Sequence, residues 1–417
     1  MLNILINAYA CSPNWGSEPG MAWNWCSNLA KYCELFIITE GEWKDEIEEA
    51  VKVHPNGRNM HFYYNPVPEK VRKMCWNQGD WRFYYFYRQW QKKTLKIAKK
   101  ICNKHKIDVL HQLNMIGFRE PGLLWKIKDI PFVWGPLGGM ELMPTGFLKG
   151  EPLKLKLALY IKNIINRIQR RYQPNVNKAL KRAGGLAAAT KGVYDFVKEQ
   201  HKKDIILLNE TGCYEREIPL KAHDKNTFDV VWVGKYDYRK QLGLAIESIA
   251  RLKDCRKLKL HIIGTGTDAE VNRYKSLAYQ LDVDDMIVWH GKIPNSEVQR
   301  IMRESDLFFF TSIMEGTPHV VLEAIQNALP VICFNACGQS GVINDSVGVK
   351  IEQTNKETSV VDFSTAIRGL YNSPDKLRSM SQNCNLRQKE ICWDGKAQIM
   401  LKIYKGAIEM FAQQLHK

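Results

Sequence analysis

The stretch from 306 to 334 constrains the fold most, because two short apolar runs enclose one amphipathic segment. The run 307–310 is apolar at every position, as expected for a parallel strand that is buried on both faces. Apolar residues then recur at helical spacing over 321–328, and Pro330 precedes a second apolar run over 331–334. A strand, a helix and a strand in this order predict a parallel α/β sheet.

Two carboxylates occupy defined places in this stretch. Glu315 lies in the turn after the first strand, and Glu323 lies in the helix, where Thr317 is expected to cap and Pro318 suits the first position. Ligands of open α/β sheets bind at the carboxyl ends of strands, and the N–H groups of a helix start favour an anion such as a diphosphate. Alternatively, both acids complement the helix dipole on a solvated face.

The same alternation extends along the rest of the chain. In the C-terminal part, the apolar runs that predict strands are 228–233, 258–263 and 286–289, and Ser296 with Gln299 predicts a capping box. In the N-terminal part, the predicted strands are 3–8, 35–38, 108–111 and 131–134. A chain of 417 residues is long enough for two domains of about 200 residues. We expect two doubly wound parallel sheets, with the crossover in the polar stretch 209–226.

The formal net charge of +16 indicates an anionic partner. Nucleic acid, an anionic membrane surface and phosphorylated substrates are all candidates, but no zinc-finger, RRM-like or helix-turn-helix signature supports the first. Cations interleave with aromatic residues over 70–100 and with aliphatic residues over 153–182, as an interfacial surface requires. Alternatively, the apolar residues are core and the cations form a solvated face.

Apolar runs and cysteines bear on the expected location. No apolar run approaches the ~20 residues of a membrane span, and the apolar start lacks the basic residues of a signal peptide. The 11 cysteines show no metal-ligand spacing, which predicts reduced and mostly buried thiols. We therefore expect a cytoplasmic protein, and peripheral association with the inner face of the cytoplasmic membrane is left open.

The string from Glu315 onward resembles the signature of the family 4 retaining glycosyltransferases of group 1 type, which have GT-B architecture. That signature is a Glu, seven residues, a second Glu, an Ala and then a strand that begins Leu-Pro-Val, as at 329–331. The resemblance implies that Glu315 contacts the donor sugar, that Glu323 holds the nucleotide ribose, and that Gly316 and Thr317 lie beside the substrate. It also implies two Rossmann-like domains that face a cleft: an acceptor domain over 1–212, onto which the last helix within 396–417 packs back, and a donor domain over 213–395.

The segment 233–240 is the expected diphosphate site. In the resembled family, a Gly-Arg pair followed five residues later by Lys binds the diphosphate. This chain has Gly234 and Lys235 at the pair, with Lys240 at the matching place. Lys keeps the charge but loses the bidentate fork, and we expect Arg239 to compensate. Glu315, Lys240 and Lys235 are thus the predicted catalytic residues, although a surface charge cluster is the alternative.

Other predicted substrate contacts follow from the same resemblance. They belong to the N-terminal glycine loop, to a Gly-x-Gly turn and to the residues after the third strand: Gly16, Gly20, Gly264, Gly266, Lys292 and Ile293. His111 is predicted to end a strand at the cleft, where the family often carries His-x-His, but Leu113 replaces the second His. His111 either orients the acceptor or is a satisfied core histidine. Arg119 and the loop 134–139 are expected cleft walls.

These features together predict a metal-independent, retaining glycosyltransferase. It would move a hexose from a nucleotide-sugar donor to a lipid-linked or oligosaccharide acceptor in cell-surface polysaccharide biosynthesis. We expect no cofactor, no metal and no nucleic-acid partner, and the expected further partner is an anionic membrane surface. The alternatives are a nucleotide-sugar epimerase of the same fold and a non-catalytic basic protein that binds membrane or nucleic acid. A glycosidase is less consistent, because its two carboxylates must flank one bond roughly 5 Å apart.

Overall fold

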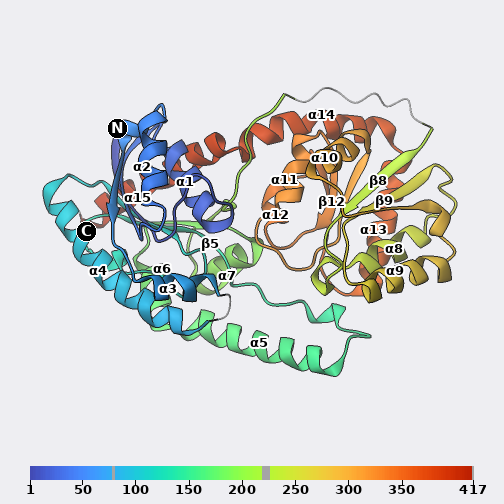
Figure 1. Cartoon of the computed structure of the whole chain (residues 1–417), viewed down its shortest axis with the longest axis horizontal. Helices are drawn as coiled ribbons and strands as arrows, with labels where there is room; N and C mark the ends of the chain where they lie inside the picture. Colours follow the sequence, from blue (N-terminus) through green and yellow to red (C-terminus); the bar gives the residue numbers. More distant parts are fainter. Residues whose placement is uncertain (78–79, 218–225, 416–417) are drawn as a thin grey trace.

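The computed structural model of the protein describes residues 1–77, 80–217 and 226–415. They form two parallel β-sheets, each with helices on both faces, that lie side by side (Figure 1). The prediction of two doubly wound, Rossmann-like halves is therefore confirmed. The polar stretch 209–226 leads from the first sheet to the second, although its residues 218–225 lie outside the described part of the chain.

The N-terminal sheet has the strand order β3-β2-β1-β4-β5-β6-β7. Its strands are β1 (Leu2–Ala8), β2 (Cys33–Thr39), β3 (Met60–Tyr64), β4 (Val109–Asn114), β5 (Phe132–Leu137), β6 (Gly185–Ala188) and β7 (Ile206–Leu207). All neighbouring strands run parallel. Because β4 extends to Asn114, His111 lies in the middle of this strand and not at its predicted end.

The C-terminal sheet has the order β10-β9-β8-β11-β12-β13 and is also parallel throughout. Its strands are β8 (Phe228–Val233), β9 (Leu258–Ile263), β10 (Ile287–Gly291), β11 (Leu307–Phe310), β12 (Val331–Phe334) and β13 (Gly348–Ile351). Four of them begin and end at the predicted residues. Most of their positions are buried and apolar, and β11 and β12 are buried throughout, so the ends of these strands are visible in the sequence.

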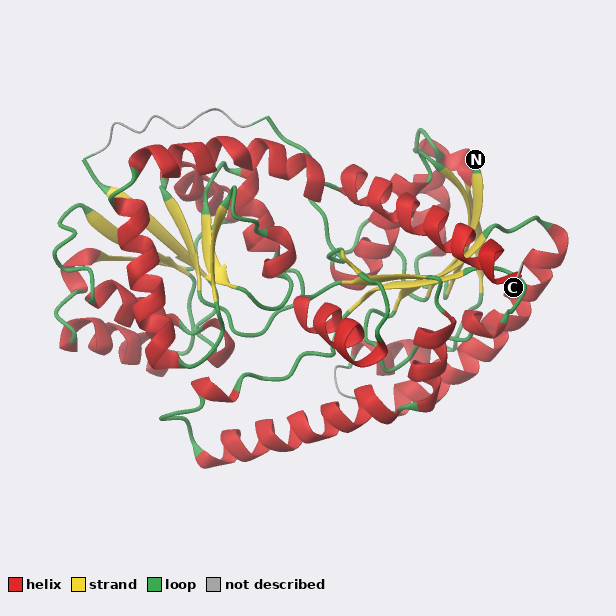
Figure 2. Cartoon of the chain, turned by 180° about the vertical axis from the view of Figure 1, so that it is seen from behind, coloured by secondary structure: helices red, strands yellow, loops and turns green. Residues whose placement is uncertain are grey.

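Helices cover both faces of each sheet (Figure 2). The N-terminal half contains α1 (Ser17–Leu29), α2 (Lys44–Val53), α3 (Glu69–Trp76), α4 (Arg82–Lys104), α5 (Leu153–Tyr172), α6 (Pro174–Arg182) and α7 (Lys191–His201). The remaining helices are α8 (Leu242–Ala250), α9 (Asp268–Gln280), α10 (Asn295–Glu304), α11 (His319–Gln326), α12 (Gln339–Val342), α13 (Lys356–Tyr371), α14 (Pro374–Ile391) and α15 (Trp393–Leu415).

Two predicted helix caps are wrong. Pro318 is the N-cap of α11, and Thr317 makes no capping bond, because its side chain is engaged elsewhere. Pro294 is the N-cap of α10, so Ser296 lies inside the helix and the expected capping box does not form. A capping box is found instead at α9, between Thr267 and Glu270.

The last two helices return the chain to the N-terminal half, as Figure 1 shows along one side of both sheets. Trp393, Ala397, Met400, Ile403 and Tyr404 are buried in one core with the N-terminal strands and α1. A second connection runs the other way. Met143, Phe147, Leu148 and Leu159, which precede or begin α5, are buried in the core of the C-terminal half.

The remaining expectations about the chain concern cysteines and membrane spans. All 11 cysteines are free, and nine of them are buried, as the prediction of mostly buried thiols expected. Over the three ranges that the structure describes, none of the helices combines the length with the apolar character that crossing a bilayer requires.

Candidate functional site

The candidate site lies where the strand order of the sheets reverses. This happens between β8 and β11 in the C-terminal sheet and between β1 and β4 in the N-terminal sheet. In open α/β sheets, ligands bind outside the carboxyl ends of the strands at this point. The loops after β8 and β11 are joined there, because the Ile313 N–H donates to the Arg239 carbonyl at 2.8 Å and the Thr311 hydroxyl to the Lys240 carbonyl at 2.7 Å.

These joined loops bring Lys240 and Glu315 into contact. Lys240 Nζ lies 2.7 Å from Glu315 Oε1, and each side chain is 17% exposed. The Ser312 hydroxyl donates to the same carboxylate oxygen at 2.7 Å, and the Lys240 ammonium lies 5.3 Å from the centre of the Phe310 ring. The ion pair, the Ser312 hydrogen bond and the Phe310 ring together fix the positions of the two side chains. Lys240 has further N–H donors for an anion, and Glu315 Oε2 can accept from a hydroxyl group.

The other two cations of the predicted diphosphate site lie apart from this pair. Arg239 is exposed, and its guanidinium pairs with Asp237 at 3.2 Å, so it does not join Lys240 as expected. Lys235 is exposed just after β8 and makes no ion pair with any residue that the structure describes. Of the three predicted catalytic residues, the structure brings together Lys240 and Glu315.

Glycines form the floor of the site at the ends of β8, β9 and β10. The Gly234 N–H donates to the Ile263 carbonyl at 3.0 Å, and the Gly264 N–H donates to the Gly291 carbonyl at 2.8 Å. Gly264 has φ +129, and a Cβ at this position would lie 1.8 Å from the Gly234 carbonyl oxygen, so only glycine fits. Gly266 is constrained as well, because a Cβ there would lie 2.5 Å from a Glu270 carboxylate oxygen.

The neighbouring predicted contacts lie at the edge of this floor. Lys292 and Ile293 directly follow Gly291, whose φ is +66; Lys292 is exposed, and Ile293 packs partly on the C-terminal core. Gly316 is exposed directly after Glu315. The structure thus places all three next to the carboxyl edge of the sheet.

A carboxylate occupies the start of α11, where a diphosphate is expected. The Thr317 N–H donates to Glu210 Oε1 at 2.8 Å, and the Thr317 hydroxyl donates to Oε2 at 2.6 Å. The Glu210 carbonyl accepts from the indole N–H of Trp25 in α1 at 2.8 Å. Glu210 therefore connects the two halves of the molecule across the base of the site. The sequence carries no signal for it beyond an acidic residue in a polar connection.

Glu323 lies in the second turn of α11, and its carboxylate faces α10. Burial raises its pKa, although hydrogen bonds from Gln299 and Asn295 and the nearby cations oppose the shift. The carboxylate is thus partly withdrawn from water and already has amide partners. Nothing in the described contacts joins it to Glu315, so the two predicted carboxylates occupy separate places on the loop and the helix.

Two half-buried carboxylates that the sequence analysis did not single out lie on the N-terminal side. Glu18, in the glycine loop, accepts from the Ile116 N–H at 2.7 Å, which ties this loop to the one after β4. Burial raises the pKa of Glu18, and the charge of Glu210 adds to the shift. Glu141 is hydrogen-bonded by Thr190, and burial raises its pKa too. Glu18 could have been noticed because of its place inside the glycine loop.

The glycines of that loop have different environments. Gly16 is the N-cap of α1, and a Cβ there would meet no atom within 4 Å. Gly20 lies in the first turn, where a Cβ would lie 1.9 Å from the Trp15 carbonyl oxygen. Gly20 is therefore required for the local fold, and Gly16 leaves open space at the site.

The placement of His111 corrects the expectation that it faces the cleft. The side chain is fully buried, and Nε2 lies 2.7 Å from the Gly135 carbonyl oxygen. Because a carbonyl only accepts, Nε2 carries the proton, and Nδ1 accepts from the Tyr404 hydroxyl at 2.7 Å. Burial lowers the pKa of His111 to about 4. Both ring nitrogens are used, so the alternative of a satisfied core histidine describes this residue.

Metal ligands are not grouped at this site. In the part of the chain that the structure describes, no three or more His, Cys, Asp or Glu side chains are arranged to hold a metal ion.

Comparisons with known proteins agree with this geometry. A family described as "Glycosyl transferases group 1" matches residues 215–387, which include Lys240, Glu315 and Glu323. The lipopolysaccharide 1,6-galactosyltransferase of Escherichia coli K12 is 26% identical over 153 residues, which are 36% of this chain and 41% of that enzyme. The chain spans about half the length of the curated relatives it matches first, from 41% to 55%.

Solved structures share the whole fold at low sequence identity. The apo form of the lipopolysaccharide outer core galactosyltransferase WaaB superposes with a TM-score of 0.59 at 14% identity, over 98% of this chain and 99% of that one. Anabaena Alr3699/HepE, in complex with UDP, has a TM-score of 0.54 at 13% identity, over 97% and 100%. The family match over residues 215–387 identifies the C-terminal half as a group 1 glycosyltransferase domain, and the two parallel sheets and the superposition with WaaB show that the whole chain has the GT-B fold.

Proposed function

We propose that the chain is a retaining hexosyltransferase that transfers a sugar from a nucleotide-sugar donor to a lipid-linked or oligosaccharide acceptor. The observation that supports this most is the partly buried Lys240–Glu315 pair between the ends of β8 and β11. A leaving diphosphate needs a fixed cation and N–H donors, and a sugar needs a hydroxyl acceptor. Both lie within one joined pair of loops.

The donor would lie along the carboxyl edge of the C-terminal sheet. In this proposal, Lys240 and Lys235 face the diphosphate, Glu315 accepts from a sugar hydroxyl, and Glu323 binds the ribose. The glycine floor, with Gly234, Gly264 and Gly266, lets the nucleotide approach the backbone closely, and the backbone of residues 292–293 faces the base. We assign the donor to residues 213–395 and the acceptor to residues 1–212 with the final helix.

The transfer step requires no strong base from the protein. The bond between the anomeric carbon and the diphosphate oxygen breaks, and the acceptor oxygen forms its bond to that carbon on the same face. The acceptor proton goes to the departing diphosphate oxygen, which leaves as the nucleoside diphosphate. Lys240 stabilises the charge that develops on this oxygen, and Glu315 positions the sugar.

An anionic membrane surface is the proposed location of the acceptor. Helix α5 packs polar residues inward, since Asn163 and Asn166 are only 5% exposed and hydrogen-bond the backbone at Met143 and Glu141. Its outward face carries a stripe of half-exposed aliphatic and aromatic side chains: Leu157, Tyr160, Ile161, Ile164, Ile165, Ile168 and Tyr172. Exposed cations flank the stripe at Lys154, Lys162, Arg167 and Arg171. An apolar face bordered by cations suits the headgroup region of a bilayer.

Calorimetric titration with UDP, GDP and ADP tests the donor assignment. UDP comes first because the Anabaena structure of this fold contains it. We expect Lys240→Ala to weaken nucleotide binding by at least tenfold, because a cation that the loops hold in place is lost from the diphosphate. Lys257→Ala is the matched control, since Lys257 is exposed at the opposite edge of the same sheet. Equal affinities for both variants, or no nucleotide binding by the wild type, would contradict the assignment.

Glu315→Gln separates sugar contact from nucleotide contact. It should leave the affinity for the free nucleotide within about threefold of the wild type and reduce sugar transfer or donor hydrolysis at least a hundredfold. Flotation with anionic vesicles tests the surface, and binding should decrease with salt because exposed charges are screened. Absence of co-flotation at low salt counts against the membrane assignment alone.

A further inference from the structure

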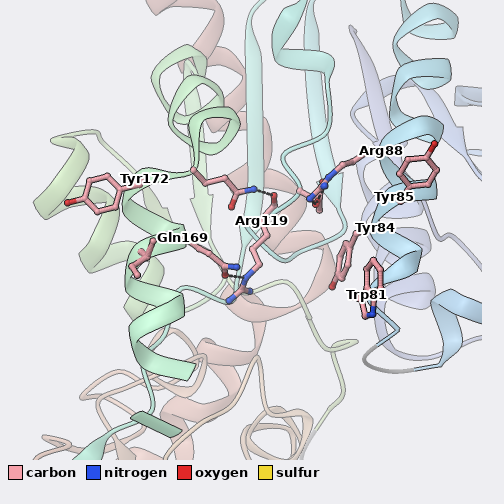
Figure 3. Close-up of a pocket in the computed structure, with 10 residues that line it drawn as sticks. Trp81, Tyr84, Tyr85, Arg88, Arg119, Gln169 and Tyr172 are labelled. Atoms are coloured by element: carbon pink, nitrogen blue, oxygen red, sulfur yellow. Dashed lines mark hydrogen bonds and ion pairs between the residues drawn. The ribbon is translucent and has the colours of Figure 1, made fainter. Parts of the chain in front are cut away.

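A pocket of about 680 Å³ lies between the beginning of α4 and the end of α5, on the N-terminal half. Rings and one aliphatic side chain form most of its wall: Trp81, Tyr84, Tyr85, Ile168 and Tyr172. Figure 3 shows Trp81 and Tyr84 on one side, Gln169 on the opposite helix, and Arg119 between them. The proposed donor and catalytic residues are absent from this wall.

The polar groups of the pocket are already paired with one another. Arg88 forms an ion pair with Glu120 at 2.6 Å, and Arg119 donates to Gln169 at 2.5 Å. The Gln173 amide donates to the Arg119 carbonyl at 2.6 Å. A sugar in this pocket would have to break these bonds to gain its own. The free surface consists mainly of ring faces and hydrocarbon, which favours an apolar occupant.

The charge beside the pocket is complementary to an anion. Arg119 forms no ion pair with a carboxylate among the described residues, and burial lowers its pKa. Its guanidinium lies over the Phe118 ring at 4.7 Å and donates at 2.6 Å to the Asn166 side chain, which is neutral and leaves the charge uncompensated. A phosphate next to Arg119 would supply the missing negative charge.

The pocket connects the proposed acceptor side of the cleft with the outer stripe of α5. Arg119 follows Phe118, whose N–H donates to the Gly138 carbonyl at 3.2 Å, and the Gly138 N–H donates back to the Ile116 carbonyl at 3.0 Å. The N–H of Ile116 in turn binds Glu18 of the glycine loop at 2.7 Å. At the other end, Ile168 belongs both to the pocket and to the exposed stripe.

We propose that this pocket holds the hydrocarbon chain of a phosphate-bearing, lipid-linked acceptor, with the phosphate beside Arg119. This rests on the proposed function, because it specifies the acceptor of the same transfer reaction. The hydrocarbon chain of the acceptor would enter from the stripe of α5, and its sugar end would point along the loop 115–119 toward the cleft. The occupant is thus an anionic amphiphile, and neither a free oligosaccharide nor a bulk phospholipid is required.

The test uses farnesyl diphosphate below its critical micelle concentration, titrated into the full chain with the donor site saturated by UDP. Inorganic diphosphate and maltotetraose, each under the same conditions, are the chain-free and glycan probes. The pocket variant is Trp81→Ala with Tyr84→Ala, which changes two exposed rings. The control variant is Tyr279→Ala with Leu386→Ala, whose side chains are exposed on α9 and α14. Affinity for UDP reports the fold of every variant.

We expect the wild type to bind farnesyl diphosphate at least tenfold more tightly than inorganic diphosphate, and maltotetraose not measurably. The pocket variant should bind farnesyl diphosphate at least tenfold more weakly than the wild type, whereas the affinity of the control variant should stay within twofold of the wild type. Both variants should still float with anionic vesicles. Equal binding of farnesyl and inorganic diphosphate would overturn the proposal, as would an unaffected pocket variant. If maltotetraose bound more tightly than farnesyl diphosphate, the pocket would be a glycan site. If the pocket variant lost flotation together with farnesyl diphosphate binding, the pocket would serve general membrane contact. Failure of UDP to bind the wild type would instead refute the donor assignment.

Discussion

Replacing Glu210 with Gln should tighten the binding of a nucleoside diphosphate. The Glu210 carboxylate accepts from the N–H of Thr317 at 2.8 Å and from its hydroxyl at 2.6 Å. These are the donors at the start of α11 on which the diphosphate assignment depends. A diphosphate that approaches this N–H must displace the carboxylate or bind beside its negative charge. The Glu210→Gln substitution would keep the shape and one accepting oxygen but remove the charge.

The magnitude follows from the separation of the charges. Two like charges about 5 Å apart repel by about 3 kcal/mol at an effective dielectric constant of 20, and by about 0.8 kcal/mol in bulk water. Glu210 is half-buried, so its environment lies between these limits. Removing the charge should therefore improve binding by about 1 to 2 kcal/mol, which is roughly 5- to 30-fold in Kd. The unliganded protein should lose about 1 kcal/mol of stability, because a charge-assisted hydrogen bond becomes a neutral one.

Isothermal titration with UDP measures the effect at low and high ionic strength, and urea unfolding measures the stability. Glu49→Gln is the matched control, since Glu49 is exposed on α2 and the substitution changes the net charge equally. The gain in affinity should shrink with added salt for the Glu210 variant and be within twofold of wild type for the control. A Kd that is unchanged or weaker in the Glu210→Gln protein would refute the reasoning.

Three further outcomes concern stability. Gly264→Ala should lower the free energy of unfolding by about 3 kcal/mol or more, because φ is +129 at this position and the added Cβ would meet the Gly234 carbonyl. Gly369→Ala, where a Cβ meets no atom, should leave the free energy of unfolding unchanged, and urea unfolding compares the two variants. Below pH 6.5 the unfolded state protonates His111 before the folded state, whose pKa is about 4, so stability should fall by up to about 3 kcal/mol between pH 6.5 and 4, and His111→Gln should flatten this slope. Burial lowers the pKa of Lys396 to about 8, so the stability of the wild type relative to Lys396→Met should rise by about 3 kcal/mol from pH 8 to 10.5.

The sequence reveals the four inner strands of the C-terminal sheet well because most of their positions are buried, whereas the strands β3, β6, β7 and β13 were not predicted. The predicted ranges 228–233, 258–263, 307–310 and 331–334 agree with the structure to the residue. Strand β4 is less visible, since Gln112 and Asn114 are buried polar residues that hydrogen-bond within the N-terminal half. Their polarity conceals the last half of the strand, and this is why His111 was expected at a strand end.

Helix α5 was visible as an amphipathic segment, but its orientation was not. Periodicity shows which side chains share a face, and an apolar face is ordinarily the buried one. Here Asn163 and Asn166 face the protein because they satisfy backbone groups at Met143 and Glu141, and the aliphatic face remains outside. These backbone partners lie about 20 residues away on an irregular segment, so no local sequence pattern predicts the hydrogen bonds.

The candidate site shows the same limit at single residues. The sequence correctly indicates that the segment before α11 offers N–H donors, and it suggests Thr317 as their nearest partner. The structure supplies Glu210 instead, 107 residues earlier in the chain. Arg239 shows the reverse case, because Asp237, only two residues away, engages a guanidinium that was expected to reach the diphosphate. Local sequence therefore predicts which donors and acceptors the site presents, but competition among near and distant partners decides which of them stay available to a ligand.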